Sequence, residues 1–244
     1  MKVCAIIPAF NEERFIAGVV RGVREQGLPV LVVDDCSRDA TSERARAAGA
    51  EVVRHDTNRG KGAALATGFA WAREHGFEAA VTLDGDGQHD PRELGAFLET
   101  AVRERADIVV GSRFLGRGAR GMPPVRKLTN RFMSGVLSFM AGRRLTDTQS
   151  GYRLIRVAVW DALAVSSTRF DAESEMLVRA CRTGMRVAEV PIRTIYGEEA
   201  SSMRPVRDTL RWIGLLVRLW REGRRRRRAA AGLRGDPARR AFPT

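Results

Sequence analysis

Five short apolar runs alternate with segments of helical length, and this alternation constrains the fold more than any other feature. The runs read VCAIIPAF (3–10), PVLVVDD (29–35), AEVVRH (50–55), EAAVTLDGD (78–86) and ADIVVGSR (106–113). They are rich in β-branched residues and mostly lack polar alternation, which is typical of parallel strands covered on both faces. Between them, helices are expected over Glu12–Gln26, Thr41–Ala48, Gly62–His75 and Pro91–Glu104. The sequence therefore predicts an α/β fold with a mainly parallel sheet and helices on both faces.

The size of the chain and its cysteines narrow the class of protein. With 244 residues, 44% of them hydrophobic, the chain can bury one full core, and we expect one domain. Its three cysteines are widely spaced without a CxxC pair, so we expect free thiols in a reducing compartment and no structural zinc. The first apolar run is too short for a signal peptide, and no run approaches the ~20 residues of a membrane span. These features predict a cytoplasmic protein.

The positive charge is concentrated at the carboxyl terminus. The formal net charge is +13, but residues 204–244 hold 13 arginines against three acidic residues, which leaves the rest of the chain nearly neutral. A nucleic-acid-binding module would explain this tail but would leave the acidic motifs described next without a purpose. No nucleic-acid partner is therefore expected.

Polar residues collect where the expected strands end, which is where parallel sheets bind ligands. The densest group is DGDGQHD, in which Asp84, Asp86 and Asp90 would repel one another unless an oxygen-seeking divalent cation neutralised them. The segment is not an EF-hand, since His89 stands where that loop needs glycine, and the chain has no GxxxxGK[ST] phosphate loop. His89 itself is interpreted as a solvated loop residue. The other strand ends admit a turn or a helix start as an alternative to a binding role.

Seven motifs in order resemble one known family. They are PAFNEE, VVDDCSRDAT, NRGKGAAL, LDGDGQHDP, GSRF, DTQSGYRLI and VPIRTIYGEEASS, and the match as a whole runs from about residue 3 to residue 210. Together they resemble the family-two glycosyltransferases, in the branch of dolichyl-phosphate mannose synthase and the bacterial polyprenyl-phosphate sugar transferases. The resemblance implies a single GT-A domain, a nucleotide diphosphate sugar donor, Mg²⁺ or Mn²⁺, inversion at the anomeric carbon and a polyprenyl phosphate acceptor.

The resemblance also implies roles for individual residues. The donor nucleotide would be bound by residues of four motifs: Pro8, Asn11, Glu12, Asp34, Asp35, Lys61 and Asp84. The metal ligands would be the DxD pair and a nearby amide, namely Asp84, Asp86 and Gln88. A cation there would stabilise the charge that builds up on the departing diphosphate.

Three arginines match those that the family places around phosphates, namely Arg113, Arg126 and Arg153. A guanidinium suits this task because its planar fork binds phosphate with two hydrogen bonds. The alternative is that they are surface arginines in an arginine-rich chain. One departure from the family pattern is Asn130, which stands where the lipid-phosphate relatives usually carry serine.

The acceptor decides whether a general base is needed. A sugar hydroxyl needs a base within hydrogen-bonding reach, whereas a lipid phosphate arrives ionised. Asp147 is the best-placed candidate for a base, and the alternative is that it caps a turn or orients Arg153. Glu173 and Glu175 open a helical pattern, where acidic residues favour the helix dipole.

The expected organisation is a catalytic domain over 1–203, a basic amphipathic helix over 204–223 and a disordered arginine-rich tail over 224–244. This carboxyl-terminal segment is expected to hold the protein peripherally on the anionic inner face of the cell membrane. The predicted reaction is hexosyl transfer to polyprenyl phosphate. One alternative is a family-two enzyme with a soluble acceptor. Another is a sugar nucleotidylyltransferase, but such an enzyme would have a glycine- and arginine-rich phosphate loop after its first strand, and the segment PAFNEERF is not of that kind. Asp34 and Asp35 are compatible with either base, so they do not distinguish a GDP-linked from a UDP-linked donor.

Overall fold

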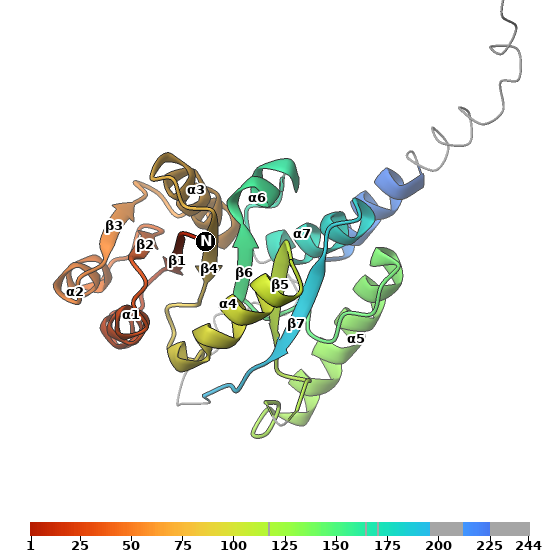
Figure 1. Ribbon diagram of the computed structural model, residues 1–244, viewed down its shortest axis with the longest axis horizontal. Coiled ribbons are helices and arrows are strands. Elements are labelled where there is room, and N and C mark those ends of the chain that lie inside the picture. Colours follow the sequence, from red (N-terminus) through yellow and green to blue (C-terminus); the bar gives the residue numbers. More distant parts are fainter. Residues whose placement is uncertain (117, 164, 170, 196–211, 225–244) are drawn as a thin grey trace, which may run out of the picture. The chain divides into compact units, whose positions relative to one another are not determined.

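The protein is built around one seven-stranded sheet (Figure 1). The computed structural model describes residues 1–116, 118–163, 165–169, 171–195 and 212–224. The strand order is β3-β2-β1-β4-β6-β5-β7. In chain order the strands are β1 (Val3–Ala9), β2 (Val30–Asp34), β3 (Glu51–Arg54), β4 (Ala79–Thr82), β5 (Ile108–Ser112), β6 (Arg153–Arg156) and β7 (Val187–Pro191). The five expected strands are all present, and the predicted α/β fold is confirmed.

Helices cover both faces of this sheet, which is why its strands lack polar alternation. Every residue of β1, β2, β4 and β5 is buried. One face packs on α1 (Ile16–Glu25), α2 (Thr41–Ala47) and α4 (Leu94–Arg103), which follows the short 3-10 helix η1 (Pro91–Glu93). The opposite face packs on α3 (Lys61–Glu74), and α3 in turn contacts α6 (Val157–Leu163) and α7 (Asp171–Arg182). Helix α5 (Pro124–Ala141) lies beside α7.

Strand β6 runs antiparallel between two parallel strands. Arg153, its first residue, lies opposite Thr82 of β4 and opposite Val110 of β5. Because β6 is reversed, its amino end lies beside the carboxyl ends of those neighbours. The loop that precedes β6 therefore reaches the sheet edge where ligands are expected.

Helix α1 begins at Ile16 rather than at Glu12, where the sequence places it. The backbone N–H groups of Glu12 and Glu13 donate to the side chains of Thr41 and Asp39. These contacts hold the preceding residues in a loop and delay the helix by one turn.

The carboxyl-terminal region is a separate compact unit. The chain divides into residues 1–201 and 202–244, and residues 212–224 of the second unit form a helix. Residues 204–211 and 225–244 lie outside the described residues, so of the predicted arginine-rich tail over 224–244 only Arg224 is described, as the last residue of this helix. The boundary at residue 203 stays a prediction. None of the helices described is long and apolar enough to cross a membrane.

Candidate active site

The loops after β1 and β2 are joined by hydrogen bonds. Asn11, with a φ of 59°, donates its backbone N–H to Ser37 Oγ at 2.9 Å. The backbone N–H of Glu12 donates to Thr41 Oγ1 at 2.8 Å. Pro8 lies within β1, directly before this loop. The three residues of the predicted nucleotide loop therefore lie together at the carboxyl edge of the sheet.

Asp34 is fully buried at the end of β2 and closes a turn. Its Oδ1 accepts the backbone N–H of Ser37 at 2.8 Å, and its Oδ2 accepts the hydroxyl of Ser42. Arg54 Nη1 lies 3.5 Å from the same Oδ2. The turn that the sequence offered as an alternative is therefore present. Nucleotide binding by Asp34 stays a prediction.

Asp35 ties the end of β2 to the start of α3. Its Oδ1 accepts the backbone N–H of Arg59 at 2.9 Å and lies 2.7 Å from His55 Nδ1. Its Oδ2 accepts the backbone N–H of Gly60 at 2.6 Å. The other ring nitrogen of His55 lies 2.9 Å from Thr67 Oγ1, which fixes the ring. His55 belongs to none of the motifs that predicted the site, although it stands at the end of an expected strand.

Lys61, the first residue of α3, bridges two acidic residues. Its Nζ lies 2.5 Å from Asp84 Oδ1 and 3.1 Å from Glu173 Oε1. Burial alone would lower the pKa of Lys61, but attraction to Asp84 and Glu173 raises it above its ordinary value. Burial would raise the pKa of Asp84, but the charge of Lys61 and the hydrogen bond from His89 hold it well below its ordinary value. Glu173 is thus part of the site and not only a helix-start residue.

His89 is buried, so its interpretation as a solvated loop residue is wrong. Only 6% of the residue is exposed, and its Nε2 lies 3.4 Å from Asp84 Oδ2. Its ring packs at a tilt on Tyr152, which stacks on Phe97 with ring centroids 4.3 Å apart. These aromatic contacts remove His89 from water and hold it beside the DxD pair.

The residues predicted to hold a divalent cation follow β4 on one loop. Asp86 Oδ1 accepts the backbone N–H of Gln88 at 3.0 Å, which fixes the loop. Gly151 faces Asp84 closely: a Cβ at Gly151 would lie 2.7 Å from Asp84 Oδ2 and 2.8 Å from Lys61 Nζ. A glycine there leaves space beside the carboxylate.

This donor set fits Mg²⁺ or Mn²⁺ shared with a diphosphate. In the described part of the chain, no cluster of three or more His, Cys, Asp or Glu residues could hold a metal ion. Two carboxylates are enough, however, because Mg²⁺ is usually bound by one or two carboxylates together with substrate phosphates. Asp84, Asp86 and Gln88 would be the protein's ligands.

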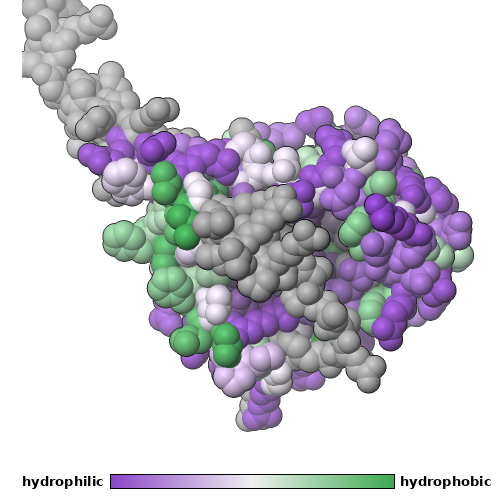
Figure 2. All heavy atoms as spheres, turned by 180° about the vertical axis from the view of Figure 1, so that it is seen from behind, coloured by the Kyte–Doolittle hydropathy of each residue, from purple (hydrophilic) through white to green (hydrophobic). Residues whose placement is uncertain are grey.

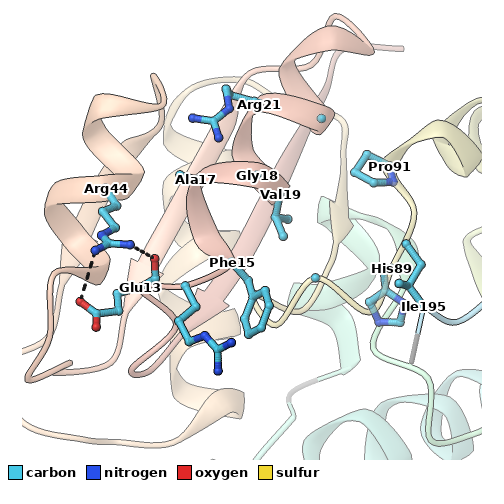
Figure 3. Close-up of a pocket in the computed structure, with 13 residues that line it drawn as sticks. Glu13, Phe15, Ala17, Gly18, Val19, Arg21, Arg44, His89, Pro91 and Ile195 are labelled. Atoms are coloured by element: carbon cyan, nitrogen blue, oxygen red, sulfur yellow. Dashed lines mark hydrogen bonds and ion pairs between the residues drawn. The ribbon is translucent and has the colours of Figure 1, made fainter. Parts of the chain in front are cut away.

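A cavity of about 480 Å³ borders the loop after β4, with Gly87 and His89 among its lining residues (Figure 3). Residues of α1 and of the segment just before it, among them Phe15, line one wall, and His89, Pro91 and Ile195 line the other. The Gly87 position lies against Phe15, since a Cβ there would be 3.5 Å from Phe15 Cβ. His89 therefore stands between this cavity and Asp84.

Arg113 and Asp147 form a buried ion pair with two hydrogen bonds. Arg113 Nε donates to Asp147 Oδ2 at 2.7 Å, and Nη2 donates to Oδ1 at 2.8 Å. The backbone N–H groups of Arg113 and Gln149 add bonds of 3.1 and 3.2 Å to the same carboxylate. Asp147 has no exposed surface. It is therefore engaged with Arg113, and not with Arg153 as one alternative had it.

Arg153 and Arg126 lie in different surroundings. Arg153 is 1% exposed and donates to the carbonyl oxygens of Ser150, Thr148 and Glu173 at 2.8, 2.9 and 2.7 Å. It holds the loop before β6 to the start of α7. Arg126 is partly exposed in the first turn of α5. A phosphate-binding role for each stays a prediction.

The fold and this group of acidic and basic residues at one sheet edge define the class of GT-A glycosyltransferases. The chain belongs to glycosyltransferase family 2: the family described as "Glycosyl transferase family 2" matches residues 4–163.

Two relatives extend the match over most of the chain. It is 36% identical over 244 residues to an undecaprenyl-phosphate mannosyltransferase of Micrococcus luteus, covering 90% of this chain and 99% of the relative. It is 35% identical over 199 residues to a polyprenol monophosphomannose synthase of Mycolicibacterium smegmatis, covering 77% and 75%.

A solved structure shares the fold. Glucosyl-3-phosphoglycerate synthase from Mycobacterium tuberculosis, in complex with Mg²⁺ and UDP, superimposes with a TM-score of 0.69 at 22% identity. The similarity covers 89% of this chain and 79% of that one.

Proposed function

We infer that this glycosyltransferase moves a hexosyl unit from a nucleotide diphosphate sugar to polyprenyl phosphate, with inversion at the anomeric carbon. The names of the two relatives above support a polyprenyl phosphate acceptor. The observation that carries the proposal is the buried Arg113–Asp147 pair. Asp147 was the best candidate for a general base, and it is held by Arg113. A phosphate acceptor needs no base because it is already ionised.

The acidic loop after β4 would bind the donor diphosphate through Mg²⁺ or Mn²⁺, which would act as a Lewis acid on the departing oxygens. Asp84, Asp86 and Gln88 would hold the ion, and Lys61 beside Asp84 would face the same diphosphate. The loops that carry Pro8, Asn11 and the Asp34–Asp35 pair would bind the nucleoside. The neighbour of the same fold was solved with UDP and Mg²⁺, which supports a nucleotide and a metal ion as ligands of such a site.

The acceptor would approach from α5. Arg126 in its first turn would orient the lipid phosphate through its planar fork, while Arg113 and Arg153 keep the surrounding loops in place. We place the enzyme peripherally at the cytoplasmic face of the cell membrane, where a nucleotide sugar and a lipid phosphate meet.

A panel of GDP- and UDP-linked hexoses with polyprenyl phosphate, in Mg²⁺ and in Mn²⁺, tests this function. We expect chloroform-soluble, lipid-linked sugar from one donor, and none after chelation of the metal. Hydrolysis of the donor alone does not support the proposal. Transfer to a soluble acceptor such as 3-phosphoglycerate, with no transfer to the lipid, would refute it.

A further inference from the structure

Helix α5 exposes a stripe of large apolar side chains. Four of them, which we call the α5 stripe, are 63% to 89% exposed: Val125, Leu128, Phe132 and Phe139. Their spacing of three, four and seven residues places them on one face of the helix. The buried residues of α5 are Asn130, Ser134, Leu137 and Ala141, which lie on the opposite face.

This stripe is unusual within the protein. Among the described residues of the first unit, eight large hydrophobic side chains are exposed, and four of the eight belong to the stripe. Hydrophobic residues (green) gather on the side of the molecule where α5 lies (Figure 2). Single exposed apolar residues need no explanation, but a contiguous group rimmed by polar residues indicates an interaction surface.

The positive charge around the α5 stripe indicates which kind of partner the stripe binds. From residue 111 to residue 145 the sequence has eight arginines and lysines and no aspartate or glutamate. Arg131 within α5 and Arg143 and Arg144 just after it are exposed. A second copy of the chain docked through this face would bring these positive charges against their own equivalents, which costs free energy. An anionic lipid surface satisfies both features, because it accepts apolar side chains below its headgroups and attracts basic ones at their level.

The other face of α5 touches the candidate site. Ser134 Oγ accepts the backbone N–H of Thr148 at 3.0 Å. Thr148 in turn offers its carbonyl oxygen to Arg153 and directly follows Asp147, the partner of Arg113. The helix therefore connects the exposed stripe with the loop that reaches the sheet edge.

We propose that the α5 stripe and its flanking basic residues are the surface by which this protein docks on an anionic lipid bilayer. The stripe lies in the headgroup region and orients the site toward the membrane. Only the reason for docking, which is to bring the site to a lipid phosphate, rests on the proposed function. The proposal is independent of the arginine-rich tail.

The test is co-sedimentation of the full-length protein with vesicles of phosphatidylcholine and phosphatidylglycerol. Leu128→Glu, Phe132→Glu and the double variant place carboxylates in the stripe, and Val102→Glu makes the same type of change at an exposed position of α4. We expect the double variant to bind at least about tenfold more weakly than wild type. Val102→Glu should bind like wild type, and all variants should keep the wild-type melting temperature.

Three results would overturn the proposal. The stripe variants could sediment like wild type. Deletion of residues 225–244 could abolish binding while the double variant retains it, which would assign the binding to the tail. The wild type could be a dimer that the variants dissociate while vesicle binding is unchanged, which would assign the stripe to a second copy.

Transfer to a short, water-soluble polyprenyl phosphate separates this proposal from the proposed function. The stripe variants should keep wild-type rates on that acceptor and lose activity only on acceptor embedded in vesicles. Absence of transfer with every protein, together with the expected loss of sedimentation, would refute the proposed function and leave the docking surface intact.

Discussion

Asp147→Asn distinguishes a structural carboxylate from a general base. In the structure Asp147 has no exposed surface and accepts from Arg113 Nε at 2.7 Å and from Nη2 at 2.8 Å. Asparagine keeps one oxygen but turns an amide NH₂ toward a guanidinium donor, and it removes the negative charge that Arg113 pairs with in the interior. Removing one partner of a buried ion pair costs about 3–5 kcal/mol.

The expected change in melting temperature follows from that energy. For a domain of this size, 1 kcal/mol corresponds to roughly 2–4 °C, so the variant should melt roughly 6–20 °C below wild type. The control is Asp161→Asn, which makes the same chemical change in an exposed pair, 3.1 Å from Arg73. The control should lose at most about 1 kcal/mol.

The assay combines thermal melting with transfer rates measured well below the variant's melting temperature. A structural Asp147 predicts the large thermal shift described above. A general base predicts that Asp147→Asn melts like Asp161→Asn while transfer falls by about two to four orders of magnitude. That second result would refute the assignment of Asp147 to Arg113 and with it the base-free mechanism.

Three further predictions concern single side chains. Asp86→Asn should abolish transfer and keep the melting temperature within about 2 °C of wild type, because it removes one charge from a partly exposed loop; full activity in excess chelator would contradict the metal assignment. Arg153→Lys should lower the free energy of unfolding, measured with urea, by roughly 2–4 kcal/mol, since an ammonium cannot reproduce three buried guanidinium bonds to carbonyls. A variant as stable as wild type would contradict this structural role and favour the predicted role in phosphate binding. Burial raises the pKa of Glu175, but hydrogen bonds from Ser167 and the charge of Arg179 bring it below 4.5, so its stabilisation is present above that pH and lost on acidification. Glu175→Gln should therefore unfold with a weaker dependence on pH below about 4.5, and an unchanged acid transition would contradict this.

The sequence predicted the strands because their composition is dictated by burial on both faces. The run from Val30 to Asp34 is buried throughout, and the polar residues that follow it lie at the sheet edge as expected. The same reasoning located the DxD loop after β4. Strands and loops whose structure depends on residues adjacent in the chain could therefore be predicted from the sequence.

Strand β6 shows why other features of the fold and the site could not be predicted from the sequence. It has four residues, and nothing in its composition indicates that it inserts in reverse between β4 and β5. The partners of the site are similarly distant along the chain. Glu173 reaches Lys61 because α7 contacts α3, and Tyr152 from the loop before β6 packs on the His89 ring. These contacts depend on the tertiary arrangement and leave no periodicity in the sequence.

Asp35 and Asp84, both predicted to bind the donor, differ in how readily their hydrogen-bond partners can be exchanged. Asp35 accepts from the backbone N–H groups of Arg59 and Gly60, which cannot leave without moving the backbone. It also lies against the His55 ring, which Thr67 holds in place. Asp84 is paired instead with two side chains, His89 at Oδ2 and Lys61 at Oδ1. If the predicted site is right, a rotation of the Lys61 side chain would free Asp84 Oδ1 for a metal ion and bring the ammonium to a diphosphate without moving the sheet. Asp35 is therefore suited to fixing the shape of the nucleoside site, and Asp84 to exchanging one cation for another.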